Sequence, residues 1–232
     1  MIAIIPARGG SKGLIKKNIR SLGNQPLIHW TIKSALASKY ISKVILSTDD
    51  KEIARYCRYT GVEIPFMRPK KLAQDKSLAI DTYLYTIKKL KKEFEYKNDE
   101  FIVLLPTTPF RNSNDIDNAI KIFYKKNASS LISCQEMNHP ISWSFSIDKF
   151  GIIKKKMKTL KNRQDEKNMY LPNGGIFILK YSLIKKVKSY YFKNTYAYLM
   201  PKYRSLDIDT EDDFKLAEFY LKIYKKKINV EK

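Results

Sequence analysis

The sequence predicts an α/β fold whose mainly parallel sheet is covered by helices on both faces. Short apolar runs alternate with amphipathic stretches up to Gln135, and this order is typical of right-handed βαβ units. Hydrophobic residues make up 44% of the 232 residues and aromatic residues 12%, which is enough to fill a core. No break in composition divides the chain, so we expect a single domain over 1–232.

The expected elements follow in chain order from the apolar periodicity. Pro26 suits the first turn of a helix, and Asp50 with Glu52 suits the acidic start of the next one. A buried strand at 174–179 and a last helix that begins at Thr210 complete the fold. The other strands are expected at 2–7, 43–48, 62–66, 101–105 and 129–135, and the other helices at 26–39, 50–60, 77–95 and 113–126.

An insertion at about 137–172 interrupts this alternation. Trp143–Ile147 and Ile152–Ile153, joined by a turn that ends at Gly151, are typical of a β-hairpin. The hairpin is rich in aromatic residues and lysines and has little core of its own. We therefore expect it to pack on the main domain or on a second subunit.

The net charge of +22 comes almost entirely from lysines spread along the expected helix faces. Lysine suits hydrated surfaces, whereas arginine suits phosphate recognition, so the charge indicates a solvating surface more than a nucleic-acid site. No apolar stretch approaches the roughly 18 residues of a membrane helix, and we expect a cytoplasmic protein with no membrane or nucleic-acid partner. Cys57 and Cys134 have no metal-binding spacing and are expected to be buried thiols.

The first expected strand leads directly into a turn rich in glycine and cations, from Ala7 to Lys17. It matches neither the Walker A pattern nor the dinucleotide fingerprint. Gly9 and Gly10 would let backbone N–H groups approach an anion, and Arg8, Lys12 and Lys17 would supply positive charge for phosphate oxygens. The alternative is an ordinary basic surface turn.

Two carboxylates, Asp207 and Asp209, would lie on the same side of an extended segment, since strand side chains repeat every two residues. They would repel each other unless a cation lay between them, and oxygen ligands of this kind suit Mg²⁺ completed by phosphate. The alternative is helix capping, because Thr210 and Asp213 have the spacing of a capping box. We assign Asp213 and its acidic neighbours to the helix start.

A third polar group precedes the strand at 174–179. Arg163 and Gln164, followed by Asn173, offer a planar donor fork and two amides that suit a carboxylate or hydroxyls, although a simple turn also explains them. His29 and His139 are isolated and are expected to be structural. No Ser-His-Asp or Cys-His arrangement is present in the pattern.

Taken in order, these motifs resemble the CMP-sialic acid synthetase (acylneuraminate cytidylyltransferase) family along almost the whole chain. The matching segments are Ile5–Lys12, Lys17–Ile19, Ser47–Asp49, Arg68 with Leu72–Asp75, Leu104–Pro109, Arg163–Asp165, Asn173–Gly174 and Asp207–Asp209.

The resemblance implies a Rossmann-like three-layer nucleotidyltransferase fold. It implies transfer of CMP from CTP to the anomeric hydroxyl of an acidic nine-carbon sugar, such as N-acetylneuraminic, legionaminic or pseudaminic acid, with release of pyrophosphate. The hairpin would exchange between the subunits of a homodimer. The nucleotide would be held by Arg8, Gly9, Gly10, Ser11, Lys12, Lys17, Asn18, Arg68 and Ser77.

The remaining roles also follow from the resemblance. Asp207 and Asp209 would carry Mg²⁺. The sugar would be bound by Arg163, Gln164 and Asn173, and the catalytic residues would be Arg8, Lys17, Arg163 and Asp209. Such a displacement needs charge neutralisation and alignment more than a protein nucleophile. The general base stays open between a metal-bound hydroxide and a carboxylate such as Asp209.

Two departures from the family pattern concern the sugar. Leu105 stands where many members have an amide, and Leu171 with Pro172 stands where many have a charged residue. Fewer polar contacts predict a less polar acid, such as legionaminic or pseudaminic acid. The alternatives are another sugar nucleotidyltransferase, for example a 3-deoxy-manno-octulosonate cytidylyltransferase, or a basic nucleic-acid-binding module.

Overall fold

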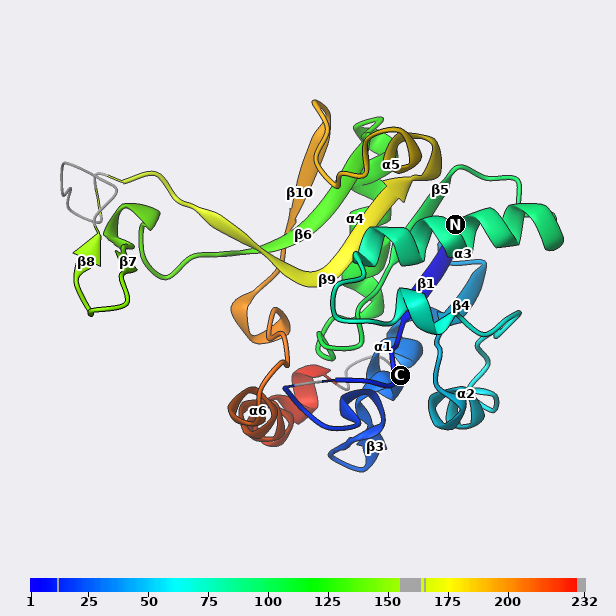
Figure 1. The fold of residues 1–232 in the computed structure, drawn as a ribbon, viewed down its shortest axis with the longest axis horizontal. Helices are drawn as coiled ribbons and strands as arrows, with labels where there is room; N and C mark the ends of the chain where they lie inside the picture. The colour runs from blue at the N-terminus through cyan, green and yellow to red at the C-terminus, as the bar shows by residue number, and fades with distance from the viewer. Residues whose placement is uncertain (12, 155–163, 165, 229–232) are drawn as a thin grey trace.

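A six-stranded sheet forms the centre of the molecule (Figure 1), which we describe from a computed structural model covering residues 1–11, 13–154, 164 and 166–228. The strand order is β10-β6-β9-β5-β1-β4, and β9 alone runs antiparallel to its neighbours. The mainly parallel sheet is therefore confirmed. The strands are β1 Ile2–Pro6, β4 Lys43–Ser47, β5 Glu100–Val103, β6 Ser130–Glu136, β9 Tyr170–Lys180 and β10 Thr195–Leu199.

Helices cover both faces of the sheet, as predicted, because successive residues of β1 point to opposite sides. Ala3 and Ile5 pack in a core with α1, α2 and α4, while Ile2 and Ile4 pack in a second core with α3 and α5. The helices are α1 Leu27–Leu36, α2 Lys51–Cys57, α3 Ala79–Glu93, α4 Ser113–Lys125, α5 Tyr181–Val187 and α6 Glu211–Ile228. None of those in the described part of the chain is long and apolar enough to span a membrane.

A small third core joins the last helix to the segment after β1. Leu14 and Leu22 pack there with Ile208 and Phe214. Short two-residue strands, β2 Ser21–Leu22 and β3 Gln25–Pro26, form a hairpin in the same region. This core therefore brings the turn after β1 and the acidic segment with Asp207 and Asp209 to the same part of the molecule.

The insertion extends away from the sheet as an arm (Figure 1). The end of β6 and the start of β9 pair beyond the rest of the sheet, and the chain between them carries a short hairpin, β7 Ser146–Ile147 with β8 Ile153–Lys154. Apolar side chains are exposed along it; they are Ile141, Trp143, Phe145, Ile147, Phe150, Ile152, Ile153, Met169, Tyr170 and Leu171.

Several parts of the predicted fold differ in the structure. The strand expected at 62–66 is reduced to a single bridge between Glu63 and Ile45, because Pro65 lacks the N–H that the next pairing would need. The edge strand β10 and the helix α5 were not predicted. The helix expected at 26–39 is also shorter, ending at Leu36.

Candidate active site

The predicted nucleotide-binding residues converge on a cleft of about 620 Å³ at the carboxyl ends of β1 and β5. Ligands bind at this edge of open α/β sheets because the loops that follow the strands meet there. Seven predicted site residues line the cleft: Arg8, Ser11, Lys17, Asn18, Arg68, Ser77 and Asp209. A larger and more open hollow of about 1100 Å³ between α1 and α2 contains none of them, so we place the site in the smaller cleft.

The turn after β1 is fixed by bonds to its own neighbours. Asn18 is buried and donates through Nδ2 to the carbonyl of Arg8 at 2.9 Å. The Gly9 N–H donates to Asp49 Oδ1 at 3.3 Å, and a Cβ at Gly9 would lie 2.3 Å from Asp50 Oδ2. The Gly9 N–H therefore already has a carboxylate acceptor within the protein, and glycine is needed here for the close approach of Asp50.

The same turn lies directly against the acidic segment. A Cβ at Gly13 would lie 2.4 Å from the backbone oxygen of Asp209, so only glycine allows this approach. Gly10 is exposed and has open space around it, and it is not among the residues that line the cleft. Lys12 falls outside the described residues.

Two cations in the cleft are held by carboxylates. Arg8 pairs with Asp75 at 3.3 Å, and both side chains are well exposed. Lys17 Nζ donates to Asp209 Oδ1 at 2.7 Å and to the carbonyl of Ile208 at 2.9 Å. Exposed pairs of this kind contribute little to stability, so an anionic ligand can replace the carboxylate partners without unfolding the protein.

Arg68 differs from these cations because its side chain is almost completely buried. Its Nη2 lies 3.1 Å from Asp49 Oδ1, the same oxygen that accepts from the Gly9 N–H. Burial lowers the pKa of the guanidinium, and the Asp49 charge opposes that shift. Its Nε is buried with no hydrogen-bond partner. A buried donor without a partner is costly, and because Arg68 lines the cleft this Nε is available to a ligand oxygen.

The acidic segment places both carboxylates on one side, as predicted. Asp207 and Asp209 are exposed, whereas Ile208 between them is fully buried and donates through its N–H to Thr107 O at 2.9 Å. The pKa of Asp207 is raised, first because protein atoms around its carboxylate displace water and then because Asp209 is close; a hydrogen bond with Thr107 opposes the shift. Asp207 itself does not line the cleft.

Helix capping accounts for the residues that follow. Thr210 and Asp213 exchange hydrogen bonds, with the Asp213 N–H donating to Thr210 Oγ1 at 3.2 Å and the Thr210 N–H donating to Asp213 Oδ2 at 2.8 Å. This confirms the capping-box interpretation. Glu211 pairs with Arg20 through two 2.6 Å bonds. Asp207 and Asp209 are left as the carboxylates that capping does not use.

These two carboxylates fit a magnesium ion that is held partly by substrate. Mg²⁺ in nucleotide enzymes commonly takes one or two protein carboxylates and completes its shell with phosphate oxygens and water. The described residues contain no cluster of three or more His, Cys, Asp or Glu side chains arranged to hold a metal. Burial is the first cause of the raised pKa of Asp207, and the charge of nearby Asp209 adds to it.

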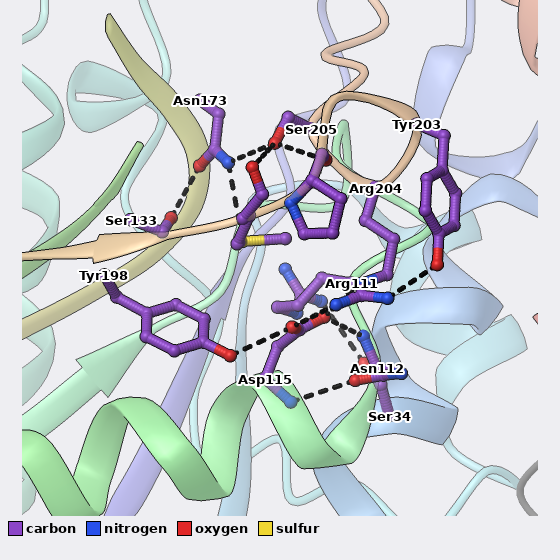
Figure 2. Close-up of polar contacts among 12 residues, drawn as sticks. Ser34, Arg111, Asn112, Asp115, Ser133, Asn173, Tyr198, Tyr203, Arg204 and Ser205 are labelled. Atoms are coloured by element: carbon purple, nitrogen blue, oxygen red, sulfur yellow. Dashed lines mark hydrogen bonds and ion pairs between the residues drawn. The ribbon is translucent and has the colours of Figure 1, made fainter. Parts of the chain in front are cut away.

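The predicted sugar-binding residues are not brought to the cleft in the described part of the chain. Asn173 is buried in a polar network (Figure 2): it accepts from Ser133 Oγ at 2.6 Å and donates to Ser205 Oγ at 2.8 Å. Its amide is therefore occupied, and direct sugar contact by Asn173 is not supported. Gln164 is exposed on the arm, and Arg163 lies outside the described residues.

Several residues around the cleft were not assigned a role from the sequence. Asp49 belongs to the segment Ser47–Asp49, which resembles the family pattern, but only the structure shows that one of its oxygens joins the turn after β1 to Arg68. Tyr83 lines the cleft, and burial raises the pKa of its hydroxyl. The position of Asp49 shortly after the end of a strand could have indicated this role, because the loops that follow parallel strands meet at one edge of the sheet.

The fold and this cleft define a nucleotidyltransferase of the α/β type, and comparison with known proteins specifies the family. The family profile described as "Cytidylyltransferase" matches residues 2–229, and the chain belongs to that family. A structure of CMP:2-keto-3-deoxy-manno-octonic acid synthetase complexed with CTP shares the fold, with a TM-score of 0.69, 13% identity and coverage of 95% of this chain and 98% of that one.

Two curated relatives are more similar in sequence. A CMP-N,N'-diacetyllegionaminic acid synthase of Legionella pneumophila is 35% identical over 94% of this chain and 94% of its own length. An N-acylneuraminate cytidylyltransferase of Streptococcus agalactiae is 35% identical over 92% of this chain, which spans only 51% of that longer relative.

Proposed function

We propose that this protein transfers CMP from CTP to the anomeric hydroxyl of a nonulosonic acid and releases pyrophosphate. One observation carries the proposal: Arg8, Lys17 and Arg68 converge with Asp209 in a single cleft at the carboxyl edge of the sheet. Membership of the cytidylyltransferase family and the names of the two curated relatives support the same reaction. We place the reaction in the cytoplasm, where CTP is supplied.

The residue types suit an in-line displacement. The sugar hydroxyl oxygen forms a bond to the α-phosphorus of CTP, and the bond from that phosphorus to the bridging oxygen breaks, so that pyrophosphate leaves with the electron pair. Arg8 and Lys17 are placed to neutralise the triphosphate, after releasing Asp75 and Asp209 respectively. Asp209, which lines the cleft, takes the hydroxyl proton. Positioning and charge carry most of the catalysis in reactions of this class.

Asp207 and Asp209 would hold the magnesium ion. When bound, Mg²⁺ supplies positive charge to the phosphate oxygens and helps to orient the leaving pyrophosphate. The protein's own contribution is to keep both carboxylates on one side of the segment, because burial of Ile208 fixes its orientation. Lys17, which pairs with Asp209 in this structure, adds a second positive charge to the same region when it moves to the phosphates.

The acceptor is a nonulosonic acid less polar than N-acetylneuraminic acid, such as legionaminic or pseudaminic acid. Leu105 supports this choice because its apolar side chain lines the cleft. Leu171 is exposed at the start of β9, outside the cleft residues, and supports it less. Side-by-side kinetics should give a higher kcat/KM for N,N'-diacetyllegionaminic acid than for N-acetylneuraminic acid; equal values would remove this part of the proposal.

The arm packs against a second copy of the chain, giving a homodimer. Its many exposed apolar side chains would otherwise contact water, and apolar patches mark protein interfaces. Light scattering should report a dimer, and the double substitution Ile147→Asp with Ile153→Asp should yield monomers. The control is Tyr59→Asp, which changes an exposed large side chain outside the arm. A monomeric wild-type protein would contradict the proposal.

The main test is a grid of pyrophosphate-release assays with Mg²⁺. CTP, UTP, ATP and GTP are each combined with N-acetylneuraminic, legionaminic, pseudaminic and 3-deoxy-manno-octulosonic acids. We expect release with CTP and the nine-carbon acids. Release with CTP and 3-deoxy-manno-octulosonic acid alone would favour the alternative cytidylyltransferase, and no release in any combination would overturn the proposed function.

A further inference from the structure

The segment that carries Asp207 and Asp209 depends on side-chain contacts for its position. Between β10 and α6 the chain is irregular, apart from a 3₁₀ turn at Lys202–Arg204. Its backbone bonds to the rest of the protein are from Met200 N–H to Cys134 O, at 2.8 Å, and from Ile208 N–H to Thr107 O, at 2.9 Å. The residues just before Asp207 lie between these two backbone hydrogen bonds, so side-chain contacts must hold them in position.

Arg204 supplies the first of these contacts through a buried ion pair with Asp115 on α4 (Figure 2). Its Nε lies 2.9 Å from Asp115 Oδ2 and its Nη2 lies 3.0 Å from Oδ1. The Asp115 side chain is 2% exposed. The Nη2 contact is a hydrogen bond, and the Nε contact is an ion pair without hydrogen-bond geometry. A charge-assisted hydrogen bond of this kind fixes direction as well as distance.

Asp115 is itself held independently of Arg204. Oδ2 accepts from the Asn112 N–H at 3.1 Å, as part of the capping box that begins α4, and Oδ1 accepts from the Tyr198 hydroxyl at 3.1 Å. Burial and the Asp115 charge raise the pKa of that hydroxyl to about 12, so Tyr198 stays a donor. Arg204 adds a second hydrogen bond to Oδ1 through Nη2, and its Nε adds an ion-pair contact at Oδ2.

Ser205 supplies the second contact. Its hydroxyl accepts from Asn173 Nδ2 at 2.8 Å, and the Asn173 oxygen accepts from Ser133 on β6 and from the Gly175 N–H. Asn173 lies where β9 departs from regular pairing with β6. Two consecutive residues, Arg204 and Ser205, are therefore attached to two different elements of the rigid fold just before Asp207.

We propose that Arg204, through its buried ion pair with Asp115, is a positioning residue for the carboxylates of Asp207 and Asp209. It touches neither substrate nor metal. Its role is to hold the 3₁₀ turn against α4, so that the acidic segment meets the cleft in one orientation. The inference rests on the proposed function only in taking these two carboxylates as the metal ligands.

This role predicts a selective defect. Arg8 and Lys17 come from a different part of the chain, the turn after β1, so loss of the Arg204–Asp115 contact should leave binding of metal-free CTP within about two-fold. Metal binding should fall, because groups that orient metal ligands commonly contribute 10–100-fold to metal affinity. A purely structural role would instead lower thermal stability and leave metal affinity unchanged.

The test uses Arg204→Lys, which keeps the charge but removes the planar guanidinium and its Nη2 hydrogen bond to Asp115. Mn²⁺ serves as the probe, and its binding to the protein with CTP present is followed by electron paramagnetic resonance. We expect the Mn²⁺ Kd to rise about 10-fold and kcat to fall, with little change in the KM for CTP. The control is Arg20→Lys, the same substitution in an exposed arginine–carboxylate fork with Glu211.

Unchanged Mn²⁺ affinity in Arg204→Lys, or an equal loss in Arg20→Lys, would overturn the proposal, as would a wild-type protein that binds no Mn²⁺. If Arg204→Lys fails to fold, Asp115→Asn with Arg204→Gln removes both buried charges together, which proteins tolerate better; the expected loss of Mn²⁺ affinity is the same. A Mn²⁺ difference in a protein that shows no pyrophosphate release would overturn the proposed function and support the positioning role.

Discussion

The charged residues near the acidic segment fall into two groups with opposite properties. The cleft group, Arg8, Lys17 and Asp209, lines the cleft and has at least one exposed partner in each of its ion pairs. The network group, Arg111, Asp115 and Arg204, is absent from the cleft lining, and its carboxylate is almost wholly buried.

This difference separates charge that is available to a ligand from charge that is used to build the fold. Exposed pairs contribute about 0–1 kcal/mol, so phosphate can replace their carboxylates at little cost. Removing one partner of a buried pair costs about 3–5 kcal/mol because a buried charge is left uncompensated. Activity should therefore depend on the cleft group and stability on the network group.

The largest effect is expected for Lys17→Ala, which should lower kcat about 10²–10³-fold, as for other groups that stabilise charge in a transition state. Its melting temperature should stay close to that of wild type, since the Asp209 partner is exposed. Pyrophosphate release and calorimetry measure the two quantities. Lys16→Ala is the matched control, because Lys16 pairs with Glu52 on the surface. Equal loss of activity in both variants would show that Lys17 has no greater role in catalysis than a lysine outside the cleft.

The next effect concerns Arg111, the largest fully buried side chain. Its Nη1 donates to the Gly175 carbonyl at 2.8 Å, and burial lowers its pKa to about 10 while the Asp115 charge opposes the shift. Arg111→Met should reduce the free energy of unfolding by about 3 kcal/mol, as measured by urea denaturation. Arg20→Met should change the free energy of unfolding by less than about 1 kcal/mol. Similar losses in the two variants would show that the buried network does not stabilise the fold more than an exposed ion pair does.

A smaller effect is expected where the first turn meets the acidic segment. In Gly13→Ala the new Cβ would lie 2.4 Å from the Asp209 carbonyl, so the turn and the segment must separate. We expect kcat to fall about 10-fold, since small misplacements of reacting groups are costly. Gly10→Ala, where a Cβ meets nothing within 4 Å, is the control. Wild-type kinetics in Gly13→Ala would show that this approach is not needed.

The smallest effect concerns Asp207 and pH. Its folded-state pKa lies above the ordinary 3.8, so wild-type protein loses stability as pH rises through the interval between the two values. Asp207→Asn should melt about 1 °C higher than wild type at pH 7, and this gain should disappear as pH falls below the interval. Melting curves across pH measure it. A lower melting temperature at pH 7 would show that the hydrogen bond with Thr107 outweighs burial.

The sequence predicted the cleft group better than the network group, for a physical reason. Arg8, Lys17 and Asp209 lie in motifs next to expected strand or helix ends, where local pattern indicates the edge of the sheet. The contact of Arg204 with Asp115 joins residues 89 positions apart, and no local pattern predicts it. Asn173 shows the same limit, since its motif suggested sugar binding while distant partners occupy its amide.

The fold shows a similar division. The strands and helices up to Gln135 were predicted from periodicity, because their apolar faces are buried. The edge strand β10 was missed: its residues alternate only between partly buried and exposed, which gives a weak apolar signal. The bridge at Glu63 was overpredicted as a strand because Pro65 ends the pairing.

Isotope tracing tests most directly whether the protein transfers the CMP unit of CTP to a nonulosonic acid. CTP labelled at the α-phosphorus or at the γ-phosphorus is incubated with the protein, Mg²⁺ and legionaminic acid. If the sugar hydroxyl attacks the α-phosphorus, the α label appears in the sugar product and the γ label in pyrophosphate. A γ label on the sugar, or no labelled sugar from either substrate, would contradict this transfer.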